Sequence, residues 1–190
     1  MKTKNPISTR HLVTAALMAA LTVAGSALRI TIPLDIAGTT SFHLGNIMCA
    51  LSGILLGPWL GGLASGLGSF IYDVVFYPAY LSEAWITFLT KGAYGLIAGL
   101  VVCAGKNKWS YGKATLATIA GALTYAALYL AKSYFYSGLF EKGLTPEAAM
   151  LTVIGKLPAT AFNAAVAVIF APILAVSIRK ALERSHISLD

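Results

Sequence analysis

The sequence predicts an all-α integral membrane protein with six transmembrane helices, both termini in the cytoplasm and a single domain over residues 1–190. Three observations lead to this prediction. Apolar residues make up 57% of the chain and charged residues only 11%, whereas a soluble domain carries about 25% charged residues. The apolar residues gather in long runs, and the basic residues stand beside the ends of those runs.

The length of each apolar run sets the number of crossings, because a helix needs about 20 residues to span the hydrocarbon. Dividing the chain at its charged and Gly/Pro-rich positions gives six segments, which run from His11 to Leu28, Phe42 to Leu56, Trp59 to Tyr77, Glu83 to Ala104, Ala114 to Tyr136 and Glu147 to Ile178. The second and third come from one uncharged stretch that would be about 44 Å long as a single helix. Pro58 cannot continue a helix interior, so this stretch is predicted to be a hairpin of two helices.

The positions of Lys and Arg predict the orientation, because cytoplasmic loops carry an excess of them. With six crossings, one side holds Lys2, Lys4, Arg10, Lys106, Lys108, Lys113, Arg179, Lys180 and Arg184, and the other holds only Arg29 and Lys142. Both termini are therefore expected in the cytoplasm of a bacterial cell, with the chain as a multi-pass protein of its plasma membrane. The net charge of +7 thus indicates membrane orientation and not a nucleic-acid partner.

Four segments carry polar residues at helical spacing. A polar side chain in hydrocarbon costs a few kcal/mol, so such faces are expected to point into the bundle or a watery cavity. The four faces consist of Ser65, Ser69 and Asp73; Glu83, Thr87 and Lys91; Tyr125, Tyr129, Lys132 and Tyr136; and Thr152, Lys156, Thr160 and Asn163.

The lysines of these faces all fall in the half of the bilayer opposite the termini, Lys91 about 12 Å below the outer end of its helix. We therefore expect a cavity that opens outward and binds a small polar ring compound between aromatic rings and a few donors. The predicted substrate-binding residues are Lys91, Lys156, Asn163, Tyr129, Tyr125, Lys132, Trp85, Asn46, His43 and Asp73.

Other interpretations of these polar residues are open. Lys91 or Lys132 could pair with Asp73 or Glu83 and simply hold the bundle together. A lysine near the interface, Lys132 above all, could instead extend to water. His43 taken alone also fits a helix-cap or packing role.

A stripe of small residues, Ala16, Ala20 and Ala24, lies on one face of the first segment. In lipid such a flat face lets another helix approach closely, so it is expected to pack internally or to contact a partner subunit. No GxxxxGK[ST], HExxH or GxSxG motif is present, and Cys49 and Cys103 have no metal-ligand spacing. The chain is therefore predicted to be no enzyme, with no cofactor, metal or ATP site of its own.

The stretch His43-Leu44-Gly45-Asn46-Ile47, followed by Leu56-Gly57-Pro58-Trp59-Leu60-Gly61, resembles the second and third helices of the S components of energy-coupling factor (ECF) vitamin transporters. Gly68 to Asp73 and Lys91-Gly92 through Gly95-Leu96-Ile97-Ala98-Gly99 are similar too, and the resemblance covers nearly the whole chain. Within that family, the stretches most resemble the branch assigned to hydroxymethylpyrimidine, with pyridoxine and riboflavin as close competitors.

This resemblance implies a subunit that binds its vitamin from outside, through loops and the outer halves of helices four to six. It also implies a transmembrane coupling protein and two ATPase subunits as partners, which use the ATP, and a contact of the coupling protein with the alanine stripe. Release of the cargo would follow toppling in the membrane. The alternative is a small self-assembling channel or accessory membrane protein, with its polar faces on the axis of an oligomer.

Overall fold

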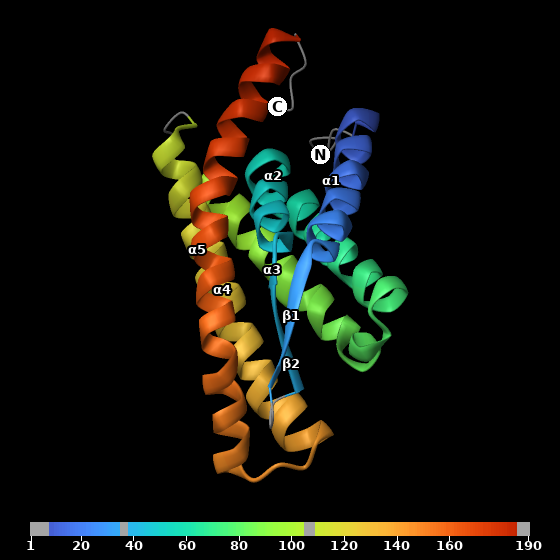
Figure 1. Ribbon diagram of the computed structural model, residues 1–190. Helices are drawn as coiled ribbons and strands as arrows, with labels where there is room; N and C mark the ends of the chain where they lie inside the picture. Colours follow the sequence, from blue (N-terminus) through green and yellow to red (C-terminus); the bar gives the residue numbers. More distant parts are fainter. Residues whose placement is uncertain (1–7, 35–37, 105–108, 186–190) are drawn as a thin grey trace, which may run out of the picture.

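The computed structural model describes residues 8–34, 38–104 and 109–185, which form a bundle of long helices with one β-hairpin (Figure 1). In chain order the main elements are α1 (Thr9–Ala27), β1 (Arg29–Leu34), β2 (Gly38–His43), α2 (Gly45–Ile71), α3 (Ala84–Cys103), α4 (Tyr111–Lys132) and α5 (Pro146–Arg184). Three short segments complete the fold, the π-helices η1 (Tyr72–Phe76) and η3 (Ser133–Glu141) and the 3-10 helix η2 (Pro78–Glu83).

Within the described residues, five helical segments are long and apolar enough to cross a membrane. They are Thr9–Ala27, Gly45–Phe76, Pro78–Cys103, Tyr111–Glu141 and Pro146–Arg184. Large apolar side chains cover their outer faces, and Trp59 is 76% exposed. An apolar exterior of this kind is suited to lipid, where every backbone polar group must be satisfied internally. The protein is therefore a multi-pass helical membrane protein.

The second of these segments is folded back on itself at Gly57, as the sequence predicts for Pro58. Gly57 has φ 75° and ψ −174°, a backbone region open essentially to glycine alone. The Ser65 hydroxyl donates to the Cys49 carbonyl oxygen at 3.2 Å, although sixteen residues of straight helix would separate them by about 24 Å. α2 therefore consists of two arms, residues 45–56 and 58–71, that pack against each other.

Small residues allow this close packing. A Cβ placed on Gly61 would lie 2.5 Å from the backbone oxygen of Ser52 on the other arm. A Cβ on Gly99 of α3 would lie 2.5 Å from the Cα of Pro58. Neither position has room for a side chain, so glycine is what allows the three helical stretches to meet.

The prediction of an all-α fold is wrong in one element, the β-hairpin. β1 and β2 pair antiparallel, with Arg29 opposite His43 and Leu34 opposite Gly38. The segment between α1 and α2 is not helical, and the pairing of its two strands supplies hydrogen-bond partners for its backbone groups. The hairpin lies against α5, where the rings of Phe42 and Phe162 meet edge to face at 4.9 Å.

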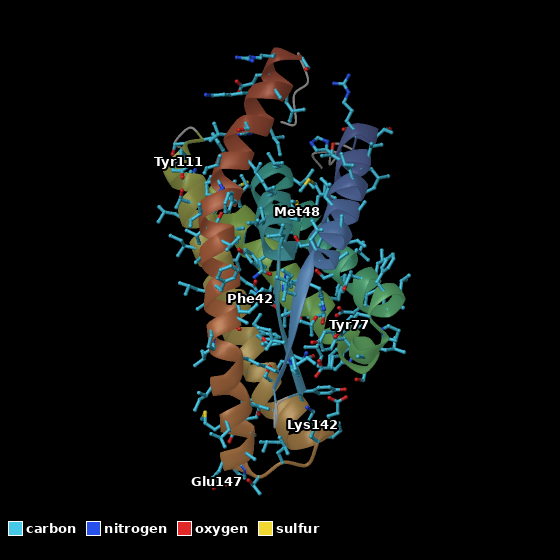
Figure 2. The ribbon with its side chains drawn as sticks, in the orientation of Figure 1. Phe42, Met48, Tyr77, Tyr111, Lys142 and Glu147 are labelled. Carbon is cyan, nitrogen blue, oxygen red and sulfur yellow. The ribbon has the colours of Figure 1, made fainter. Side chains whose placement is uncertain are left out.

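Both ends of the described chain lie at one end of the bundle. Figure 1 shows the start of α1 and the end of α5 together at the top of the view. Figure 2 places Tyr111, at the start of α4, near that end, and Lys142 and Glu147 at the opposite end. Lys142 and Glu147 are thus separated from the basic ends of α1 and α5 by the length of the bundle.

Candidate functional site

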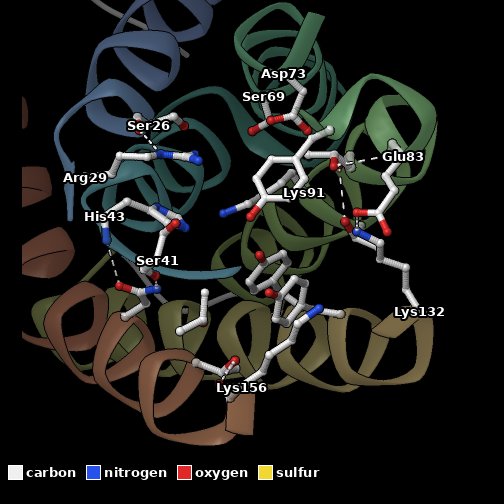
Figure 3. Close-up of a pocket in the computed structure, with 18 residues that line it drawn as sticks. Ser26, Arg29, Ser41, His43, Ser69, Asp73, Glu83, Lys91, Lys132 and Lys156 are labelled. Atoms are coloured by element: carbon white, nitrogen blue, oxygen red, sulfur yellow. Dashed lines mark hydrogen bonds and ion pairs between the residues drawn. The ribbon is translucent and has the colours of Figure 1, made fainter. Parts of the chain in front are cut away.

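The polar faces of the helices meet in a chamber in the half of the bundle away from the start of α1. The empty space between its walls is about 790 Å³, including the part open to solvent. The walls come from the end of α1, the β-hairpin, the junction of α2 with η1, η2 with the start of α3, the end of α4 and the first half of α5 (Figure 3). All of these walls belong to one chain.

Most of the predicted substrate-binding residues line this chamber: His43, Asp73, Lys91, Tyr125, Tyr129, Lys132, Lys156 and Asn163. Asn46 does not line it. Its side chain is buried behind Lys91, where the amide oxygen accepts a hydrogen bond from Nζ. Trp85 also lies outside the chamber, since it is 53% exposed and packs edge-on against Tyr136 at 5.9 Å.

Several lining residues were not among the predicted substrate-binding set: Ser26, Arg29, Ser69, Thr40, Ser41, Tyr80, Glu83, Thr87, Thr90 and Thr160. Ser69, Glu83, Thr87 and Thr160 belong to the polar faces seen in the sequence, so their spacing was a usable signal. Thr40 and Ser41 arrive on β2, whose pairing was not predicted. Arg29 is the first residue of β1, the strand that pairs with β2.

Arg29 is held in the chamber wall by aromatic rings and a backbone oxygen. Its guanidinium carbon lies 4.4 Å from the Tyr72 ring centroid and 4.9 Å from that of Tyr77. Its Nε donates to the backbone oxygen of Ser26 at 2.9 Å. These contacts fix the position of the cation and leave its Nη1 buried with no hydrogen-bond partner in the described part of the chain.

The three lysines of the chamber have different partners. Lys132 forms an ion pair with Glu83, whose other carboxylate oxygen accepts from Ser137, and both charged side chains are about nine-tenths buried. The pairing interpretation is therefore correct for Lys132, and the expectation that this side chain extends to water is wrong. The other two lysines have neutral partners.

Lys91 and Lys156 each donate to a neutral oxygen and lie near a tyrosine ring. Lys91 donates to Asn46, and its Nζ is 4.2 Å from the centroid of Tyr125. Lys156 donates to Ser133 at 3.2 Å, and its Nζ is 5.5 Å from the centroid of Tyr129. Both side chains are buried, at 4% and 7% exposure, so these amines face the chamber and the protein rather than bulk water.

A row of tyrosine rings forms one wall. Tyr125 and Tyr129 lie one turn apart on α4, with centroids 5.6 Å apart and planes 21° from parallel. Tyr94 of α3 is fully buried and packs against Tyr125 from outside the lining, with the ring centroids 6.0 Å apart. The row offers a flat apolar surface beside the amines, which is suited to an aromatic ring bearing polar substituents.

Two π-helices adjoin the chamber: η1 places Asp73 in its lining, and η3 places two hydroxyls against charged side chains of the lining. Asp73 lies in η1, and Ser133 and Ser137 lie in η3, next to Lys156 and Glu83. The wider turn of a π-helix changes the direction of side chains from the α register, and such turns occur frequently at functional sites. η1 therefore supplies one lining carboxylate, and η3 supplies hydrogen-bond partners to lining side chains.

His43 closes the side of the chamber at the end of β2. Its Nδ1 accepts from the backbone N–H of Gly45 at 3.2 Å, which requires that nitrogen to be unprotonated. Burial lowers the pKa of His43 well below its ordinary value, and the charges of Lys91 and Arg29 lower it further. His43 is therefore neutral near pH 7.

Among the residues that the structure describes, no group of three His, Cys, Asp or Glu side chains is arranged to hold a metal ion. The chamber is instead a surface of hydroxyls, amines, two carboxylates and tyrosine rings, which suits reversible binding of an organic solute.

A multi-pass membrane protein that encloses such a chamber within a single chain has the architecture of a solute-binding membrane subunit. The family model of the ECF-type riboflavin transporter S component matches residues 6–180, and the chain belongs to this family. The resemblance to ECF S components seen in the sequence is thus confirmed. The chain is the substrate-binding subunit of a vitamin transporter, which works with an energy-coupling module in a membrane, and is not an enzyme.

A relative from Pyrococcus woesei, described as an uncharacterized protein in a gap 3′ region, is also similar. It is 34% identical over 119 residues, which is 63% of this chain and 74% of that protein.

Proposed function

We propose that the chamber binds a vitamin or vitamin precursor with an aromatic ring, with hydroxymethylpyrimidine as the first candidate and pyridoxine and riboflavin as the next. The observation that carries this proposal is the row of Tyr125 and Tyr129 with buried Lys91 and Lys156 beside it. A ring stacked on the tyrosines would direct its substituents at the amines, and Asp73 would accept from an amino or hydroxyl group.

We further propose six crossings, with both termini in the cytoplasm and the chamber open to the outside. The two arms of α2 would each cross, although they form one of the five apolar segments. Support comes from the shared end of the start of α1 and the end of α5, which an even number of crossings requires. The excess of Lys and Arg at that end supports its cytoplasmic placement in the plasma membrane.

The energy for transport would come from a transmembrane coupling protein and two ATPase subunits. The sequence has no phosphate-binding GxxxxGK[ST] motif, so ATP would be used by those partners. Ala16, Ala20 and Ala24 are exposed on the surface of α1, as a contact with the coupling protein would require. Ala20→Trp is expected to abolish energised uptake by the reconstituted complex while substrate binding by the purified chain is unchanged.

The substrate is tested by calorimetry on the detergent-purified chain. One of hydroxymethylpyrimidine, pyridoxine and riboflavin is expected to bind with a Kd below micromolar. Lys91→Leu or Lys156→Leu is expected to weaken that binding about tenfold or more, since each removes a buried donor. Lys180→Leu, at an exposed position near the end of α5, is the matched control. Absence of sub-micromolar binding for all three compounds would rule out this substrate assignment.

The channel hypothesis predicts polar faces along the axis of an oligomer. Here the polar side chains of α3, α4 and α5 converge inside a single chain, which favours a binding subunit. Uptake that proceeds without ATP and without the coupling subunits would favour the channel instead.

A further inference from the structure

The chamber lining contains more positively charged than negatively charged side chains. Four cations line it, Arg29, Lys91, Lys132 and Lys156, against two carboxylates. Among the described residues that line the chamber, the one ion pair within 4.0 Å is Lys132 with Glu83. After that pair is set aside, three cations share a single carboxylate.

The remaining carboxylate, Asp73, is buried at 5% exposure, and no ion pair is formed with it among the described residues. Lys91 and Arg29 are in electrostatic reach of Asp73, but neither is paired with it. His43 beside them is neutral, since burial and these two cations lower its pKa. One corner of the chamber therefore carries more positive than negative charge.

Hydrogen-bond donors at this corner also lack acceptors. Arg29 Nη1 and Ser69 Oγ are both buried with no hydrogen-bond partner among the described residues. Ser69 is 3% exposed, and both residues line the chamber. Lys91 uses one donor on Asn46, and an ammonium group has three. Figure 3 shows the side chains of Arg29, Ser69 and Lys91 directed at a common space.

We infer that the corner formed by Arg29, Ser69 and Lys91 receives an anionic substituent of the substrate, a phosphate monoester or a carboxylate. An anion there accepts from the unpartnered hydroxyl and guanidinium and neutralises charge that is costly to bury. Charge-assisted hydrogen bonds to Arg and Lys are also stronger than neutral ones. This inference rests on the proposed function and specifies the substrate class: the ring compound is bound in its anionic form.

The subsite is tested first with inorganic phosphate, which needs no knowledge of the vitamin. Thermal unfolding of the detergent-purified chain is measured against phosphate concentration, with chloride added to hold ionic strength constant because the chain is basic. Phosphate is expected to raise the Tm saturably. Arg29→Gln, Lys91→Met and the milder Ser69→Ala should reduce the increase, and Lys180→Met should not.

The second measurement compares ligands that share a ring. Pyridoxine, pyridoxine 5′-phosphate and 4-pyridoxate present the same pyridine as a neutral compound, a phosphate ester and a carboxylate, and riboflavin and riboflavin 5′-phosphate form a second pair. The anionic member is expected to bind about tenfold more tightly or better. That ratio should fall to about one in Arg29→Gln, and the better of the two anions identifies the substituent.

The outcomes separate the two proposals. A wild-type chain whose Tm does not respond to phosphate, and which binds the neutral ring as tightly as its anionic forms, overturns the anion subsite and leaves the proposed function intact. Saturable stabilisation by phosphate without binding of any of the ring compounds supports the subsite and overturns the proposed substrate. Tighter binding of an anionic form supports both.

Discussion

The side-chain amide of Asn163 on α5 forms the outer hydrogen-bond partner of β2, where its oxygen accepts from the backbone N–H of His43 at 3.0 Å. The amide nitrogen donates in turn to the backbone oxygen of Ser41 at 2.8 Å. One side chain thus takes the place of a neighbouring strand and holds the hairpin against the chamber.

Asn163→Ala is expected to loosen β2, because an unpaired buried N–H costs about 1–3 kcal/mol. Hydrogen exchange in the peptide covering residues 38–44 should accelerate about tenfold or more. Ser177→Ala on the same helix serves as the control, since that hydroxyl is exposed and donates only to Ile173 of its own helix. Equal exchange in the two variants would show that Asn163 does not hold the strand.

Lys132 and Glu83 are expected to be strongly coupled in stability. Removing one partner leaves the other charge buried and unpaired, at a cost of about 3–5 kcal/mol. Glu83→Gln and Lys132→Met should each lower the stability of the purified chain, and the double variant should lose much less than the sum of the two. Additive losses in this double-mutant cycle would contradict the pairing.

Gly57→Ala is expected to destabilise the chain by about 1–3 kcal/mol, because its φ of 75° and ψ of −174° are accessible essentially to glycine alone. Gly112→Ala is the matched control. It lies in the first turn of α4, where a new Cβ meets nothing within 4 Å, so the change should be small or stabilising. The Tm values of both variants are measured by thermal unfolding. Similar values would contradict a requirement for glycine at the turn between the two arms of α2.

Because of His43, the free energy of unfolding is expected to change with pH. Its pKa is lower in the folded chain than in the unfolded chain, so the unfolded chain binds the proton first as pH falls below about 6.5. The folded state therefore loses stability between about pH 7 and the lowered pKa, by at most about 1.4 kcal/mol per pH unit, and gains nothing from His43 above that window. His43→Gln should reduce the difference in Tm between pH 7.5 and 5.5. An unchanged difference would exclude this role.

The helices could be predicted from the sequence because each is a run of apolar residues bounded by charged residues. It also indicated the turn at Gly57, since an uncharged stretch of that length exceeds the bilayer and contains Pro58. Spacing further placed Asp73 and Lys91 on polar faces that line the chamber. These inferences need only local information, which periodicity supplies.

The β-hairpin and Arg29 could not be predicted in the same way. Arg29 is held in position by the rings of Tyr72 and Tyr77, which lie more than forty residues further along the chain. A contact between such distant residues leaves no local pattern in the sequence. Trp85 is different. It follows Glu83 by two residues, which is about 200° around a helix, so spacing alone already placed it on the face away from the polar stripe.

α1 connects the chamber with the surface proposed to contact the coupling protein. Its exposed alanines face outward, and a few residues after Ala24 the same stretch supplies Ser26 and Arg29 to the chamber wall. Any protein that reorients this helix on docking also moves Arg29 relative to Lys91. Occupancy of the chamber and affinity for the docked protein are then thermodynamically linked, and each must alter the other by the same factor.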